Sequence, residues 1–98
     1  MNKQILLVED NPLVALLTED IFSSMLGGAR FTHVHSLDQA MRHMHSPFDL
    51  VICDLHMGNT TADEVIDEVC SSFRSSEVVF FSAALEKTYE DTIKNKRV

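Results

Sequence analysis

The sequence predicts a single α/β domain in which helices cover both faces of a doubly wound parallel sheet. Short apolar runs, typical of buried strands, alternate with amphipathic segments typical of helices. A strand–helix unit repeated four times favours parallel strands joined by right-handed crossovers. The length of 98 residues, with 45% hydrophobic and 23% charged side chains, fits one globular domain spanning residues 1–98.

The first strand is predicted at residues 5–8, a continuous apolar run that ends at a polar stretch. Pro12 then opens a helix, because its missing N–H lies in the first turn, where it would have no partner. We expect the apolar stripe of this helix to face the core. The stripe comprises Val14, Leu17, Ile21 and Met25, widened by Leu13 and Leu16. Gly27 and Gly28 end the helix.

The second unit is predicted from residue 30 to Pro47. Residues 30–35 alternate partly between apolar and polar side chains, as in a short strand. Ser36 followed by Gln39 is a capping-box arrangement that starts a helix. The core face of this helix is predicted to contain Leu37, Ala40, Met41 and Met44.

Two further units complete the predicted order. Residues 50–53 form a buried strand that runs into Asp54, and Thr61 caps the next helix. The apolar face of that helix comprises Ala62, Val65, Ile66, Val69 and Phe73. A fourth strand is predicted at residues 78–81, and a last helix at about residues 84–95.

Charge and composition exclude several function classes. Fifteen acidic and eight basic side chains give a formal charge of −7, which argues against direct binding to nucleic acid. No apolar run approaches the ~20 residues that span a bilayer, and the N-terminus shows no signal-peptide pattern. Cys53 and Cys70 are too few for a disulfide framework, so we interpret them as core residues of a cytoplasmic protein. The basic stretch 87–98 is interpreted as a solvated end, with a docking patch as the alternative.

Polar residues stand where three of the predicted strands end. Glu9 and Asp10 follow the first strand, Asp54 follows the third and Ser82 follows the fourth. The carboxyl ends of parallel strands meet at one edge of a sheet, where ligands bind. Three carboxylates gathered there repel one another unless a cation such as Mg²⁺ lies between them. The pattern therefore predicts a magnesium-dependent phosphoryl-acceptor site with Asp54 as the nucleophile.

Three motifs give the chain a resemblance to response-regulator receiver domains, which have a flavodoxin-like fold. Residues 5–12, ILLVEDNP, resemble the opening of these domains. Residues 49–57, DLVICDLHM, are similar to the segment around their phosphorylated aspartate. Residues 79–83, VFFSA, are similar to the segment that holds their conserved hydroxyl residue and a small residue after it.

The resemblance implies a role for each site residue. Asp54 would accept a phosphoryl group from a phosphohistidine of a sensor histidine kinase or phosphotransfer protein. Asp10 and Asp54 would hold Mg²⁺ directly, Glu9 through a bound water, and His56 through its backbone carbonyl. Ser82 would hydrogen-bond the phosphoryl group and shift, reshaping the surface around the fourth helix. The Ala83 N–H would also bind phosphoryl oxygens, and the His56 ring would tune how fast water reaches the acyl phosphate.

The sequence departs from the family pattern at two places. Gly58 and Ala62 stand where a proline and a glycine are usual, and Gly58 is expected to loosen the loop. The fifth strand, the fifth helix and the lysine at the end of that strand would lie beyond Val98, and neither Lys94 nor Lys96 is placed to replace that lysine. The chain would then be part of a longer protein, or dimerise through its exposed fourth strand or fourth helix, or be a degenerate receiver.

Two other functions are alternatives to the phosphoacceptor hypothesis. A non-switching interaction module fits the missing lysine but not the retained Glu9, Asp10, Asp54 and Ser82. An aspartyl-nucleophile phosphohydrolase would normally have an acidic residue where His56 stands, so we expect no turnover of an external metabolite. The other histidines, His33, His35, His43 and His45, have no cysteine at zinc spacing and are interpreted as surface or partly buried residues.

Overall fold

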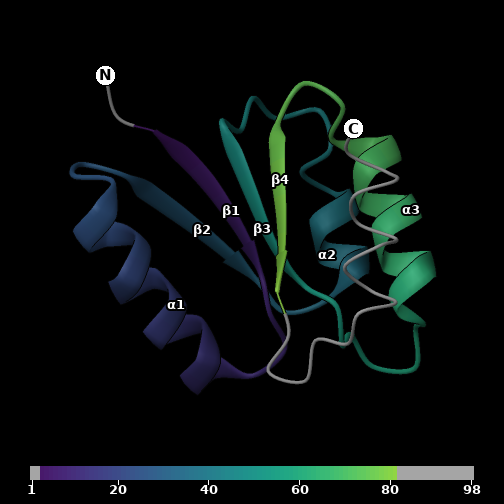
Figure 1. The fold of residues 1–98 in the computed structure, drawn as a ribbon. Coiled ribbons are helices and arrows are strands. Elements are labelled where there is room, and N and C mark those ends of the chain that lie inside the picture. Colours follow the sequence, from purple (N-terminus) through teal and green to yellow (C-terminus); the bar gives the residue numbers. More distant parts are fainter. Residues whose placement is uncertain (1–2, 82–98) are drawn as a thin grey trace.

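The computed structural model describes residues 3–81 and contains one sheet of four parallel strands (Figure 1). The strands are β1 (Gln4–Val8), β2 (Arg30–Val34), β3 (Leu50–Asp54) and β4 (Glu77–Phe81), in the spatial order β2-β1-β3-β4. This order and the parallel pairing confirm the predicted doubly wound, flavodoxin-like fold. Among residues 3–81 there is no fifth strand or fifth helix, and the helix predicted at about 84–95 lies outside the described residues.

Helices lie on both faces of the sheet and divide the core into two layers. Helix α1 (Pro12–Met25) covers one face, and helices α2 (Leu37–Met41) and α3 (Ala62–Ser72) cover the other (Figure 1). The larger core cluster lies on the α2–α3 side and includes the complete predicted apolar face of α3. Cys53 belongs to this cluster as predicted, and burial holds the pKa of its thiol far above the usual range.

The inward face of α1 is not the one that its apolar stripe predicts. Only Ala15 of this helix is fully buried, and Phe22 packs partly against the sheet beside it. Leu17, Ile21 and Met25 are instead 55%, 59% and 69% exposed. The expectation that Met25 lies on a core face is therefore wrong, because Ala15 and Phe22 occupy the side of the helix that packs on the sheet.

Helix α2 is shorter than predicted and leaves Met44 outside the core. It ends at Met41, and the backbone continues in tight turns in which His43 N–H donates to Ala40 C=O at 2.9 Å. These turns no longer follow the helical period, so Met44 is 38% exposed and the prediction of a core position is wrong. Ser36 does cap the helix, since its hydroxyl accepts from Gln39 N–H at 3.2 Å.

Strand β4 forms the edge of the sheet among the described residues. Its side chains alternate between buried and accessible positions, unlike the continuously buried β1 and β3. Val78 and Phe80 face the α2–α3 layer, whereas Val79 is 41% exposed on the α1 side. The edge position that the sequence predicts for this strand is thus present in the described part of the chain. Within that same part, no helix is long and apolar enough to cross a membrane.

Candidate functional site

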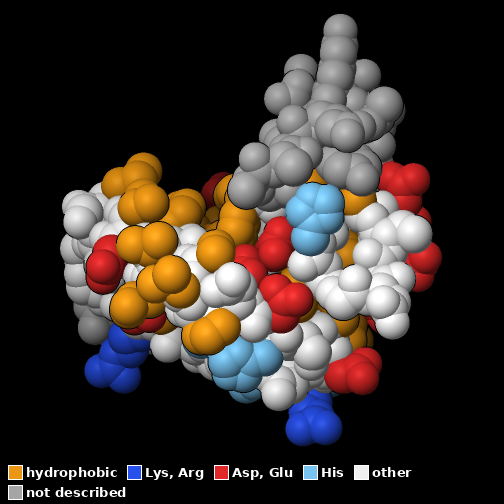
Figure 2. Space-filling view, turned by 90° about the horizontal axis from the view of Figure 1, so that it is seen from below, with side chains coloured by type: hydrophobic (Ala, Val, Ile, Leu, Met, Phe, Trp, Pro, Cys, Tyr) orange, Lys and Arg blue, Asp and Glu red, His pale blue; other side chains and the backbone are white. Residues whose placement is uncertain are grey.

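Three carboxylates meet where β1 and β3 end. In the parallel ladder Val8 pairs with Cys53, so the next residues, Glu9 and Asp54, leave the sheet at the same level. Asp10 follows Glu9 into the loop before α1. One carboxylate oxygen from each of Glu9, Asp10 and Asp54 lies within 4.8 Å of the others. Figure 2 looks onto this end of the molecule, where acidic side chains gather in the middle of the face.

Glu9 lies deepest in the cluster and is only 1% exposed. Its Oε1 accepts a hydrogen bond from Asn11 N–H at 3.0 Å, but no donor among the described residues reaches its buried Oε2. Two contacts from β2 fix its backbone: Glu9 N–H donates to Val34 C=O at 3.1 Å, and His33 Nε2 lies 2.9 Å from Glu9 C=O. The carboxylate is therefore held in place with one oxygen still lacking a partner.

Electrostatics in the cluster favour a cation. Burial, together with the negative charge of Asp54, raises the pKa of Glu9 from 4.5 to about 7 against the opposing hydrogen bond from Asn11 N–H. A hard divalent ion would remove both the desolvation cost and the mutual repulsion of the three groups. The orphaned Oε2 and the all-oxygen donor set fit such an ion. The acidic cluster can therefore bind a metal ion, as the sequence predicts.

Asp54 is the last residue of β3 and is 9% exposed. Its Oδ1 accepts from His56 N–H at 3.0 Å, which turns the carboxylate toward the loop. The hollow above it, of about 230 Å³, is lined by Glu9, Asp10, Asn11, Val14, Asp54, His56 and Phe81. His56 is exposed at the rim of this hollow, where its ring could affect the access of water to Asp54. A small tetrahedral anion could enter this hollow and reach the Asp54 carboxylate.

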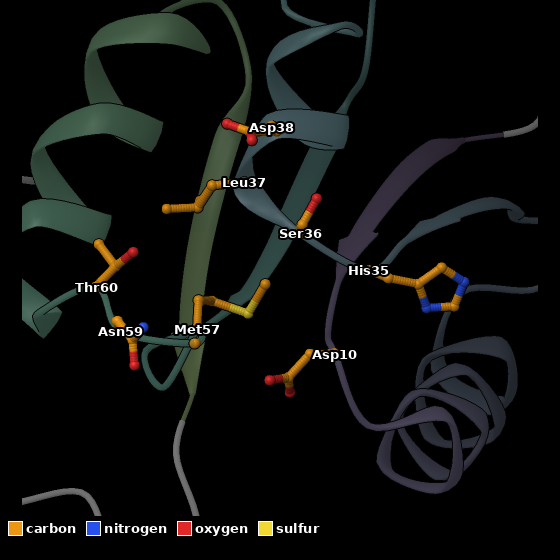
Figure 3. Close-up of a pocket in the computed structure, with 9 residues that line it drawn as sticks. Asp10, His35, Ser36, Leu37, Asp38, Met57, Asn59 and Thr60 are labelled. Carbon is orange, nitrogen blue, oxygen red and sulfur yellow. The ribbon is translucent and has the colours of Figure 1, made fainter.

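A second hollow of about 270 Å³ adjoins the cluster on the side away from α1. Figure 3 shows that it lies between the start of α2, with Ser36 to Asp38, and the loop before α3, with Met57 to Thr60. The loop closes in a tight turn, because Thr60 N–H donates to Met57 C=O at 3.0 Å. Gly58 has a φ of 58° there. Proline is locked near −65° and could not adopt this turn, which explains the glycine physically.

The structure brings together four of the predicted site residues and leaves two untested. Glu9, Asp10, Asp54 and His56 share one hollow, whereas Ser82 and Ala83, like Lys94 and Lys96, lie outside the described residues. The sequence analysis missed Asn11, which both caps α1 and donates to Glu9. Its capping role could have been predicted, because asparagine is a preferred N-cap residue and Asn11 directly precedes Pro12, the first residue of the helix. No sequence pattern indicated the contact of His33 with the Glu9 carbonyl, because the two residues lie 24 positions apart in the chain.

Comparison with known families settles the class of this domain. A family model described as the response regulator receiver domain matches residues 5–96. The chain belongs to the response regulator receiver domain family. A comparison with curated proteins found no match.

Solved structures of receiver domains share the fold at low sequence identity. The phosphorylated cyanobacterial phytochrome response regulator RcpA superposes with a TM-score of 0.82 at 22% identity, and the match covers 100% of this chain and 77% of that one. The signal receiver domain of a putative LuxO repressor from Vibrio parahaemolyticus gives 0.82 at 20%, covering 100% and 75%.

A third similar structure contains a metal ion. It is a response regulator from Burkholderia pseudomallei with a phosphorylated aspartic acid, a calcium ion and citrate, with a TM-score of 0.80 at 17% identity. The match covers 99% of this chain and 56% of that protein, so this chain spans little more than half of its length.

Proposed function

We propose that this receiver domain is a phosphoacceptor in which Asp54 takes a phosphoryl group from a phosphohistidine. The observation that carries the proposal is the position of Asp54 at the end of β3, with Glu9 and Asp10 oxygens within 4.8 Å. Two similar structures, the Burkholderia regulator and RcpA, are of phosphorylated proteins, and in the first the modified residue is an aspartic acid.

The transfer is a substitution at phosphorus. An Asp54 carboxylate oxygen forms the new P–O bond while the P–N bond to the donor imidazole breaks, and the released imidazole takes up a proton from solvent. The His56 N–H, which donates to Asp54 Oδ1 at 3.0 Å, holds the carboxylate in one orientation and leaves Oδ2 as the nucleophile. The product is an acyl phosphate in a hollow open to solvent, where the His56 ring at the rim controls how water approaches.

The cluster of Glu9, Asp10 and Asp54 would hold Mg²⁺, the hard cation that prefers oxygen ligands together with substrate phosphate. A bound Mg²⁺ supplies positive charge that offsets the charge on the phosphoryl oxygens. Of the protein's own groups, Asp10 is exposed and can bind directly, whereas the buried Oε2 of Glu9 suits a water held between carboxylate and ion. The His56 carbonyl is a further ligand in this proposal.

The proposal extends to partners and location. The phosphodonor would be a sensor histidine kinase or a phosphotransfer protein, and Ser82 and Ala83 would bind the phosphoryl oxygens and alter the partner surface. The domain assists its own phosphorylation and dephosphorylation but is not a turnover enzyme for an external metabolite. Cys53 and Cys70 are both free thiols, which suits a reducing compartment, so the proposal places the domain in the cytoplasm.

Phosphorylation by a small donor tests the proposal directly. The purified chain is mixed with acetyl phosphate and Mg²⁺, and intact mass spectrometry counts the phosphoryl adducts. Asp54→Asn removes the nucleophile with almost no change in volume. Asp63→Asn, at an exposed position in the first turn of α3, makes the same chemical change away from the cluster. Circular dichroism first establishes that all three proteins are folded.

We expect one adduct on the wild type and on Asp63→Asn, none on Asp54→Asn, and none in any protein when EDTA replaces Mg²⁺. A folded wild type that takes up no phosphoryl group would refute the proposal. That outcome would favour the non-switching interaction module instead.

A further inference from the structure

The backbone of Glu9 is bound to strand β2 through both of its hydrogen-bonding groups. Glu9 N–H donates to Val34 C=O at 3.1 Å, which continues the parallel ladder beyond the last paired residues. In such a ladder the next bond would join Glu9 C=O to the backbone N–H of Ser36. Strand β2 ends at Val34, however, and Ser36 is already the N-cap of α2. The donor to the Glu9 carbonyl therefore comes from outside the ladder.

The side chain of His33 supplies that donor. Its Nε2 lies 2.9 Å from the Glu9 carbonyl oxygen, and because a carbonyl oxygen can only accept, Nε2 must carry the proton. Side chains alternate along a strand, so His33 lies on the same face of β2 as Phe31, which packs in the core cluster on the α1 side. From this face the ring reaches the end of β1.

The imidazole ring of His33 is itself held in place. It is half-buried, and the ring of His35 packs edge-on against it, with the ring centroids 4.4 Å apart and the planes inclined at 65°. The backbone of His35 is fixed in turn, because its N–H donates to Gln39 Oε1 at 2.7 Å. A rigid ring packed in this way presents its Nε2–H in one direction.

The carbonyl that His33 binds belongs to the peptide group between Glu9 and Asp10. A peptide group is planar, so a fixed C=O direction also fixes the direction in which the chain enters Asp10. Asp10 is exposed, and its carboxylate depends on the backbone for its position more than the buried Glu9 does. One hydrogen bond thus acts on both of the carboxylates that lie near Asp54.

We propose that His33 is a positioning residue for the metal site: its Nε2–H orients the Glu9–Asp10 peptide so that both carboxylates can bind one divalent cation together with Asp54. This role rests on the proposed function, in which the cluster holds Mg²⁺. His33 acts through the backbone and does not bind the ion. Removing a group that orients a metal ligand typically lowers metal affinity 10–100-fold, and an effect through the backbone should lie near the lower end, at about tenfold.

NMR titration of the ¹⁵N-labelled 98-residue chain with MgCl₂ tests the proposal without any phosphodonor. His33→Met removes the donor and should raise the Mg²⁺ dissociation constant about tenfold. His33→Gln has nearly the same shape as His33→Met but carries an amide N–H that can replace Nε2–H, so it should recover most of the lost affinity. His43→Met is the matched control and should bind as the wild type does. His43 is also half-buried with an edge-on aromatic contact, but it lies past the end of α2.

Two measurements in EDTA distinguish positioning from a merely structural role. Long-range ¹H–¹⁵N spectra of the wild type at pH 8 should show the His33 proton on Nε2. The amide resonance of Asp10, whose N–H belongs to the bonded peptide group, should move in His33→Met and return toward the wild-type position in His33→Gln. A structural role would lower the midpoint of urea unfolding in both His33 variants and leave the Mg²⁺ affinity of the folded protein unchanged.

The proposal is wrong if folded His33→Met binds Mg²⁺ as tightly as the wild type, or if His33→Gln binds as weakly as His33→Met. An unprotonated Nε2 in the wild type, or a wild type that binds no Mg²⁺, would also overturn it. The acetyl phosphate reaction of the same proteins separates this result from the proposed function. Weaker Mg²⁺ binding by His33→Met, in a chain whose wild type forms no adduct, would support positioning and refute the phosphoacceptor. A wild-type adduct with equal Mg²⁺ affinities in all variants would do the reverse.

Discussion

The buried Glu9 should make the metal-free domain lose stability as pH rises. The native carboxyl keeps its proton up to a pKa of about 7, whereas the unfolded chain releases it near 4.5. Unfolding therefore releases a proton between these values, and the free energy of unfolding falls as pH increases through this range and stays low above it. A shift of this size corresponds to about 3 kcal/mol, because each pKa unit contributes about 1.4 kcal/mol.

Glu9→Gln removes the ionisation while keeping the size of the side chain. Urea unfolding followed by circular dichroism, in EDTA at pH 5 and pH 8, gives the free energy of unfolding of the wild type and the variant. The wild type should lose about 2.5 kcal/mol more than Glu9→Gln between the two pH values, since the unfolded carboxyl is already mostly ionised at pH 5. Glu68→Gln, at an exposed position of α3, is the control and should follow the wild type.

Glu9→Gln also distinguishes the effect of Glu9 burial on stability from the effect of Mg²⁺ binding. At pH 8, Mg²⁺ at 100 times its dissociation constant should restore about 2.7 kcal/mol to the wild type, and clearly less to Glu9→Gln at the same concentration. Identical pH profiles of the wild type and Glu9→Gln in EDTA would refute the reasoning, because they would show that Glu9 titrates alike in the folded and unfolded chains.

Three further predictions follow from the geometry. His56→Ala should change the rate of acyl-phosphate hydrolysis, measured by mass spectrometry after the donor is removed, while leaving stability nearly unaltered because the side chain is exposed; equal rates would remove any tuning role. Ile66→Ala, at a fully buried position of α3, should cost about 2–5 kcal/mol, whereas Leu17→Ala in dilute protein should cost under ~1 kcal/mol; comparable losses in urea melts would contradict the outward orientation of α1. Gly58→Ala should cost about 1–2 kcal/mol through its positive φ alone, since no atom lies within 4 Å of the added Cβ, and Gly58→Asn less; no difference between the two would argue against a left-handed turn.

Sequence alone predicted β1, β3, α3 and the acidic site correctly, because in these segments the apolar pattern allows only one face or one strand to be buried. The continuous apolar runs of β1 and β3 can only be buried on both faces, and the polar residues that end them had to meet at one edge of the sheet. The buried face of α3 was also correct, because its apolar residues form a single narrow stripe. In each case the need to bury apolar side chains left only one possible orientation of the strand or helix.

The orientation of α1 could not be predicted in this way. Apolar side chains surround more than half of this helix, so periodicity alone does not tell which side faces the sheet. The close approach of Ala15 to the sheet decides it, and that contact exists only in the folded chain. The contrast with α3 shows that a pattern predicts orientation only when its apolar face is narrow.

By itself the sequence determined the alternation of strands and helices, the parallel sheet and the group of residues that form the acidic site. These follow from short-range pattern and from the rule that parallel strands end together. Only the tertiary structure decided the depth of Glu9, its unpaired Oε2, the support from His33 and the exposed face of α1. Those features depend on contacts between residues far apart in the chain, and burial and pKa are properties of such surroundings rather than of any local stretch of sequence.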